Sequence, residues 1–164
     1  MSSFLLGSKE VFDFVNQNPG VLIKDVGYTN DPYIKAKNPK VASIDSAIQI
    51  DLTGQVCADS IGTRMISRIG GQTDFIRGAV LSEGGISIIA LASQTKTGQS
   101  KIVPVLDSGS GVTCLRADVQ WVVTEYGSVC LQGKSLKERA KLLISIAHPE
   151  YGDMLERTLY NDKF

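Results

Sequence analysis

The spacing of apolar positions in the first part of the chain predicts short helices and one strand. A helix is expected to begin after Ser8, its capping residue, and to present an apolar face until the Asn18-Pro19-Gly20 stop signal. The segment 21–26, which begins with three apolar residues, predicts a strand. Asp31 directly before Pro32 predicts the start of a second, short helix, because proline fits the first helical position.

The pattern then changes to strand-like runs interrupted by glycine. Residues 41–57 predict a strand and its return strand, with Thr53-Gly54-Gln55 as the turn between them. A glycine-rich stretch ends at Ile69-Gly70-Gly71-Gln72. Helical spacing follows and predicts a helix from Asp74 to Leu81, which Gly84-Gly85 ends.

The second half predicts several short strands and then two helices. The strands are rich in β-branched residues and are expected at 86–92, 101–106, 112–115 and 119–124. Ser135 and Glu138 form a capping-box pattern at the start of a helix with apolar residues at helical spacing, and Pro149 ends it. A final amphipathic helix is expected over 151–160. Together these elements predict an α/β domain with a mixed sheet and a terminal helical pair, in one domain covering residues 1–164.

Charge and composition narrow the possible partners. Lys plus Arg and Asp plus Glu both total 17, and a chain with zero formal charge lacks the basic excess that nucleic acid or an anionic membrane would need. The apolar runs are shorter than the ~20 residues of a membrane span. Three separated cysteines, Cys57, Cys114 and Cys130, favour reduced thiols in a cytoplasmic compartment. With His148 as the one histidine, an ordinary zinc site is not expected.

The clearest candidate for chemistry is the glycine pair before the central helix. Gly70 and Gly71 allow a tight turn in which backbone N–H groups at a helix N-terminus face outward. Such groups suit a phosphate or a developing oxyanion. The alternative is an ordinary turn that leads into a helix.

Three further side chains have both a functional and a structural interpretation. Glu125 lies where a strand reaches a glycine turn, and ligands gather at strand ends in α/β sheets; the alternative is a solvated glutamate or a structural ion pair. Lys96 follows a strand and could meet a phosphate, although exposed loop lysines are common. His148 is interpreted as a helix C-terminal residue rather than a catalytic base. The chain contains neither a P-loop nor a dinucleotide-binding glycine motif.

Taken in order, several segments resemble one family: the carboxy-terminal domain of acetyl-CoA hydrolases and 4-hydroxybutyrate or acetate CoA-transferases. The matching segments are Phe4-Leu5-Leu6-Gly7-Ser8, Asn30-Asp31-Pro32, 51–56, 70–79, 101–104, 116–119, 123–127, 131–135 and 146–149. They cover nearly the whole chain at matching intervals. The resemblance implies the open mixed-sheet α/β fold shared by CoA-transferases and the sugar-phosphate isomerase group, with helices at the C-terminus.

The resemblance also implies roles for individual residues. Gly71 resembles the residue whose backbone N–H faces CoA and the thioester carbonyl, and Gly70 would allow that close approach. Lys96 resembles a CoA-contacting lysine, and Glu125 a supporting active-site glutamate that is not the covalent one. Asn30 resembles an asparagine of the acyl pocket. Asp45 stands where relatives often have asparagine.

In this family, CoA passes between an acyl-CoA and a carboxylate acceptor through a glutamyl-CoA thioester. The attacking glutamate precedes the segment that resembles residues 4–8, so it and the amino-terminal domain are expected to lie outside this chain, and Glu10 is not its equivalent. The resemblance implies coenzyme A as the ligand, no metal, and a homodimer for the complete enzyme. Alone, the chain is expected to bind CoA without turnover. Two alternatives stay open: an acyl-CoA hydrolase of the same family, and a non-catalytic binding or assembly module.

Overall fold

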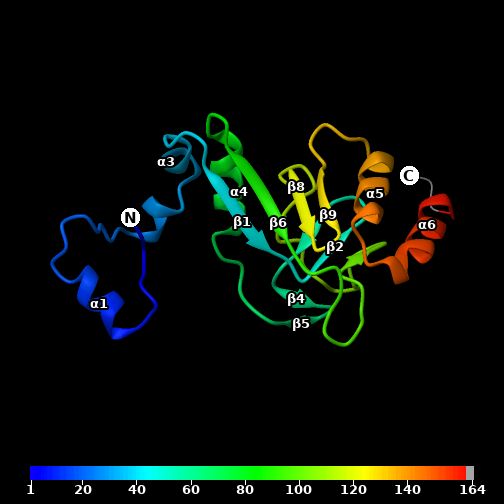
Figure 1. Cartoon of the computed structure of the whole chain (residues 1–164), viewed down its shortest axis with the longest axis horizontal. Helices are drawn as coiled ribbons and strands as arrows, with labels where there is room; N and C mark the ends of the chain where they lie inside the picture. Colours follow the sequence, from blue (N-terminus) through cyan, green and yellow to red (C-terminus); the bar gives the residue numbers. More distant parts are fainter. Residues whose placement is uncertain (162–164) are drawn as a thin grey trace.

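The computed structural model describes residues 1–161, and its largest sheet has four strands in the order β1-β6-β8-β9 (Figure 1). The bounds of these strands are β1 Ala42–Ser46, β6 Ile86–Ala90, β8 Trp121–Thr124 and β9 Gly127–Cys130. The first three strands are parallel, and β9 runs antiparallel to β8 as the second arm of a hairpin. The carboxyl ends of β1, β6 and β8 therefore meet at one edge of the sheet.

A second sheet of three strands packs beside the first, in the order β3-β2-β7. Its strands are β2 Gln49–Asp51, β3 Val56–Cys57 and β7 Ile102–Val103, with β2 antiparallel to β3 and parallel to β7. A separate two-stranded hairpin joins β4 Ser60–Ile61 to β5 Arg64–Met65. The sheets are mixed and open, which confirms the α/β fold expected from the sequence.

Six α-helices and one 3₁₀ helix lie in the described part of the chain. Their bounds are α1 Lys9–Val15, α2 Val26–Thr29, α3 Pro32–Ala36, α4 Gln72–Leu81, α5 Leu136–Ser145, the 3₁₀ turn Pro149–Tyr151 and α6 Gly152–Asn161. Two of the predicted helix starts are confirmed: Ser135 and Glu138 satisfy each other's backbone N–H groups in a capping box, and the Asp31 side chain accepts from the N–H of Tyr33. No helix within residues 1–161 is long and apolar enough to cross a membrane.

Helix α4 directly precedes β6 in the chain and packs between the four-stranded sheet and α3. Its buried side is formed by small and branched residues, Ile76, Gly78 and Ala79. The main core contains apolar side chains from both sheets, α4, α5 and α6, among them Ile50, Leu52, Ile102, Leu131 and Leu143, all fully buried. The two sheets and the last two helices thus share one apolar interior.

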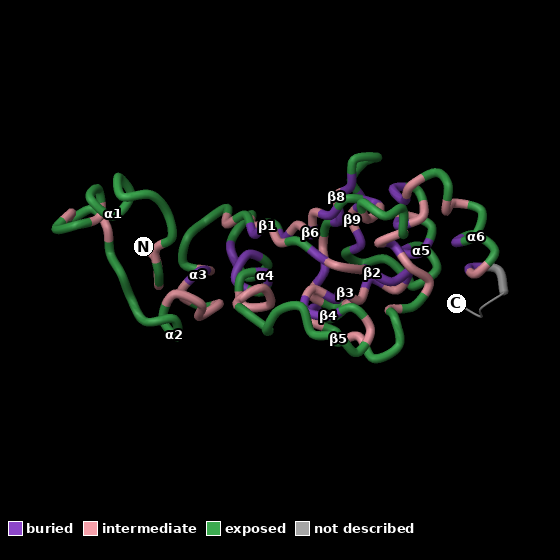
Figure 2. The backbone as a smooth tube through the Cα atoms, turned by 90° about the horizontal axis from the view of Figure 1, so that it is seen from below, coloured by how far each residue is buried: buried purple, intermediate pink, exposed green. Residues whose placement is uncertain are grey.

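The N-terminal segment lies to one side of the sheets rather than on them (Figures 1 and 2). Helix α1 has no buried residue, and Phe14 on its predicted apolar face is 66% exposed. The Ser8 hydroxyl donates to Glu10 instead of capping the helix backbone. The predicted strand at 21–26 is wrong: Ile23 makes a single bridge with Ser2, and Val26 already begins α2. An isolated apolar run does not become a strand without a neighbouring strand to pair with.

Several strand boundaries also differ from the prediction, for one shared reason. The run 41–52 divides into β1 and β2, because the chain leaves one sheet at Ala47 and enters the other at Gln49. Only 102–103 of the run 101–106 pairs as a strand, and the run 112–115 makes one bridge, between Cys114 and Val56. The pairing partner, which a single sequence does not name, decides these limits.

Candidate functional site

The candidate site lies along the carboxyl edge of the parallel strands, where α/β sheets commonly bind ligands. Helix α4 begins at this edge, because its first residue, Gln72, contacts the last residue of β1. The Gln72 amide donates to the carbonyl of Ser46 over 2.9 Å and thereby fixes the first turn of α4 to the end of β1. The backbone N–H groups of that turn have no partner within the helix.

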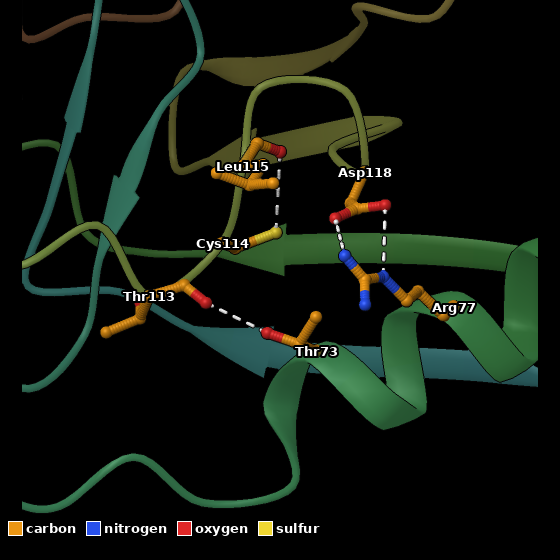
Figure 3. Close-up of polar contacts among 6 residues, drawn as sticks. All are labelled: Thr73, Arg77, Thr113, Cys114, Leu115 and Asp118. Atoms are coloured by element: carbon orange, nitrogen blue, oxygen red, sulfur yellow. Dashed lines mark hydrogen bonds and ion pairs between the residues drawn. The ribbon is translucent and has the colours of Figure 1, made fainter. Parts of the chain in front are cut away.

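A second set of contacts holds α4 against the segment that precedes β8 (Figure 3). The Thr73 hydroxyl donates to the Thr113 carbonyl over 2.9 Å. One turn later the Arg77 guanidinium pairs with the Asp118 carboxylate at 3.1 Å. These contacts position the N-terminus of α4 from two sides, so the glycine pair before it has a fixed place in the fold.

Gly71 is the N-cap of α4. Glycine is needed here because neighbouring atoms leave no room for a side chain, and not because of an unusual backbone dihedral angle. Its φ is −79°, which any residue can adopt. A Cβ at this position, however, would lie 2.5 Å from the Asn30 side-chain nitrogen and 3.3 Å from the ring of Phe75. Asn30, predicted from the resemblance alone, is therefore packed directly against Gly71. A Cβ at Gly70 would meet nothing within 4 Å, so the backbone there is open to an approaching group.

A cleft of about 890 Å³ opens in front of the glycine pair. Its walls come from the N-terminal segment, α2, α3, the end of β1 and the first turn of α4, and include Asn30, Lys35, Asp45, Gly71 and Phe75. Backbone donors, an amide and two ionisable groups thus share one cavity. This combination suits a ligand with a polar or anionic end.

Asp45 is the carboxyl group of this cleft, and burial raises its pKa above the usual value of 3.8. A hydrogen bond of 2.5 Å from the Ser43 hydroxyl opposes part of that shift. A carboxyl with a raised pKa binds its proton more tightly in the folded state than in the unfolded chain. Its ionisation therefore lowers stability as the pH rises through the folded pKa.

We expect Asp45→Asn to raise the melting temperature at pH 7 by about 2 °C, since the amide keeps the shape without the desolvated charge. The gain should shrink on acidification and vanish below pH 3.8, where both the folded and unfolded carboxyl are protonated. Thermal unfolding of the parent chain and of Asp45→Asn between pH 3.5 and 8 measures the difference in melting temperature at each pH. A gain that stayed constant with pH would mean that ionisation of Asp45 plays no part in it.

Glu125 lies at the end of β8 and is held in place by the segment after β6. Both carboxylate oxygens accept hydrogen bonds from Ser93, one from its N–H at 2.9 Å and one from its hydroxyl at 2.6 Å. These bonds lower the pKa of Glu125, so the group is a carboxylate near neutral pH. Lys101, whose backbone N–H donates to the Ser93 carbonyl, lies near enough to interact with that charge. The carboxylate is oriented and exposed at the sheet edge.

Lys96 lies on the exposed loop between β6 and β7. The loop is closed by a bridge between Gln94 and Ser100, and the Tyr151 hydroxyl donates to its Gly98 carbonyl. The Lys96 ammonium makes no ion pair or hydrogen bond with the described residues. It is therefore free to meet an anionic group.

The predicted residues form two groups along one edge. Asn30, Gly70 and Gly71 share the cleft, whereas Glu125 borders a shallower hollow between β6 and β8, and Lys96 lines neither. One strand, β6, separates β1 from β8, so the ends of these two strands lie on the order of 10 Å apart at the usual strand spacing. An extended ligand could reach both groups, whereas a small one would occupy a single group.

The three cysteines and His148 line neither the cleft nor the hollow beside Glu125. Cys57, Cys114 and Cys130 are free thiols, and burial raises the pKa of Cys114 to about 12. Residues 1–161 contain no cluster of three His, Cys, Asp or Glu side chains suited to a metal ion. His148 caps the 3₁₀ turn by accepting from the Glu150 N–H, so the expectation that it ends the preceding helix is wrong.

The sequence alone did not indicate two side chains at the edge. Ser93 directly follows the predicted strand 86–92, and the rule that ligands gather at strand ends could have found it. Lys35 could not have been found in this way, because it belongs to a short helix whose burial depends on α4. It is 8% exposed, and its ammonium has no hydrogen-bond partner among the described residues.

Comparison with known proteins identifies a family. Residues 7–159 match the acetyl-CoA hydrolase/transferase C-terminal domain. The chain is 51% identical to the 4-hydroxybutyrate coenzyme A transferase of Clostridium kluyveri over 93% of its own length and 36% of the relative. It is 33% identical to the acetyl-CoA hydrolase of Candida albicans over 71% of its length and 22% of the relative.

Solved structures agree with this result. RipA from Yersinia pestis superposes with a TM-score of 0.88 at 41% identity, covering 95% of this chain and 35% of that one. The 4-hydroxybutyrate CoA-transferase from Porphyromonas gingivalis superposes with a TM-score of 0.78 at 42% identity, covering 94% of this chain and 35% of that one. The chain spans about a third of the length of curated relatives such as the Clostridium kluyveri transferase.

Proposed function

The chain belongs to the acetyl-CoA hydrolase/transferase family, whose C-terminal domain it matches, and we propose that it forms the CoA-binding half of a CoA-transferase. The observation that carries this proposal is the packing of Asn30 against Gly71 at the start of α4. It leaves backbone N–H donors and an amide facing one cleft. A thioester carbonyl needs such donors when its oxygen becomes negatively charged.

In the proposed reaction, a glutamate outside residues 1–164 attacks the acyl-CoA carbonyl and the CoA thiolate leaves. The thiolate then attacks the resulting enzyme-bound anhydride, which releases the acyl group as a carboxylate and gives a glutamyl-CoA thioester. An acceptor carboxylate reverses both steps and leaves as a new acyl-CoA. Dividing one acyl transfer in this way lowers each barrier. The N–H of Gly71 is proposed to stabilise each oxyanion.

We also propose roles for Glu125 and Lys96, which lie outside the cleft that contains Gly71. Lys96 would meet a phosphate of CoA, since its ammonium has no anionic partner among the described residues. Glu125 is proposed to order the site rather than to form the thioester, because both of its oxygens already accept hydrogen bonds from Ser93. A hydrolase of the same family is the second candidate, favoured by the Candida albicans relative; there, water replaces the acceptor.

Calorimetric titration with CoA tests the site. We expect the chain to bind CoA and Gly71→Trp to weaken binding by at least about a hundredfold, because an indole at this position would displace Asn30 and fill the cleft. Gly152→Ala is the matched control, since a Cβ at Gly152 meets nothing within 4 Å. Equal affinity in all three proteins would refute the site; no binding by any would refute the proposal that this half binds CoA alone.

A further inference from the structure

The ammonium of Lys35 is a buried positive charge without a bonded counter-charge. Lys35 is 8% exposed, and its Nζ is buried with no hydrogen-bond partner among the described residues. The nearest carboxylates, Asp31 and Asp74, act on it only through space and form no ion pair with it. Asp31 is already engaged as the cap of α3. Burying an ammonium in this way is unfavourable unless something supplies an acceptor.

The side chain runs along α4 toward the end of the helix that borders the cleft. Its aliphatic part packs on Gly78, where a Cβ would lie 2.7 Å from the Lys35 Cβ. Its ammonium then lies 3.8 Å from the ring centroid of Phe75, which is one turn nearer the helix N-terminus. Lys35 and Phe75 both line the cleft, with Gly71 one further turn along. The ammonium thus lies against the Phe75 ring in the wall of the cleft, buried from solvent.

The cleft consequently has two places for negative charge. One is the unpaired N–H turn at Gly71, and the other is Lys35, with the Phe75 ring between them. Four residues of helix place Gly71 and Phe75 about 6 Å apart along the axis, close to the length of a short carbon chain. The Phe75 ring is 42% exposed, so it can turn toward solvent and admit a polar group to the ammonium.

We propose that Lys35 is a specificity-determining residue, which receives the free carboxylate of a dicarboxylic acyl group whose thioester carbonyl lies at Gly71. This inference rests on the proposed function and names its substrate class. A monocarboxylic acyl chain would leave the ammonium unpaired beside an apolar end. A carboxylate there would instead form a charge-assisted hydrogen bond in a buried site, where such bonds are strong.

Two stable thioether analogues of equal chain length test the proposal: butyl-CoA and 3-carboxypropyl-CoA. We expect the chain to bind carboxypropyl-CoA at least about tenfold more tightly than butyl-CoA. Lys35→Met should abolish that preference, because it keeps an unbranched chain as far as the ε position and removes the charged nitrogen. Lys37→Met removes an exposed ammonium two residues away and should keep the preference.

A second readout uses the Lys35 ammonium itself. In lysine-labelled protein, carboxypropyl-CoA should shift the NMR signal of the Lys35 side chain, and butyl-CoA should not. Equal affinities for the two analogues, a preference that survives Lys35→Met, or an unmoved Lys35 signal would overturn the inference. Binding of CoA itself separates the two proposals: if CoA binds without a carboxylate preference, only the role of Lys35 fails. If CoA does not bind, the proposal that this chain binds CoA fails. Titration with free succinate then tests the role of Lys35 separately, through the NMR signal of its side chain.

Discussion

Replacing Gly85 with alanine is expected to destabilise the chain by about 3 kcal/mol or more, at the upper end of what overpacking costs. Gly85 lies between the end of α4 and the start of β6. A Cβ there would come 2.1 Å from the Ala79 carbonyl oxygen and 3.0 Å from that of Val41. Both atoms belong to the backbone, so relief requires α4 or β1 to move. Because α4 carries the glycine pair into the cleft, the same shift would disturb the site.

Urea unfolding followed by circular dichroism measures this loss. Gly152→Ala is again the control, because the added methyl group meets nothing within 4 Å at that helical position. Its stability should stay within about half a kcal/mol of the parent. If Gly85→Ala unfolded at the same urea concentration as Gly152→Ala, the tight connection between α4 and β6 would not hold in solution.

The second large effect is expected at Arg139, a buried guanidinium bonded to backbone carbonyls. Arg139 is 9% exposed and donates to the carbonyl oxygens of Arg116, Lys134 and Thr53. The bond to Arg116 is the shortest, at 2.6 Å. Through these contacts α5 is connected to the turn after β2 and to the segment before β8.

We expect Arg139→Met to lower the free energy of unfolding by about 3 kcal/mol, because it removes a largely buried guanidinium and leaves three backbone carbonyls without their donor. Lys141→Met on the exposed side of the same helix is the matched control and should change it by less than about half a kcal/mol. Urea unfolding of the parent chain and the two variants measures these free energies. Equal losses in both variants would indicate a general effect of helix α5 rather than of the carbonyl contacts.

The comparison of sequence and structure is clearest at the glycine pair. The sequence predicts a helix from Asp74 because its apolar spacing and helix-entry residues are local; α4 begins two residues earlier, at Gln72, directly after Gly71. The reason for the glycine is not local. It depends on Asn30, which lies 41 positions earlier and reaches Gly71 only because α3 packs on α4.

Local signals therefore determined the elements: the Asp31 and Ser135 caps, the turn at Gly54 and the helices α4, α5 and α6 follow from residues a few positions apart. The tertiary structure alone decided which strands pair, and so where the run 41–52 divides between two sheets. It also decided that Ser93 holds Glu125 and that Lys35 is buried beside the cleft. The physical reason is that burial and pairing are properties of contacts between distant segments, whereas helix spacing and capping are properties of neighbouring residues.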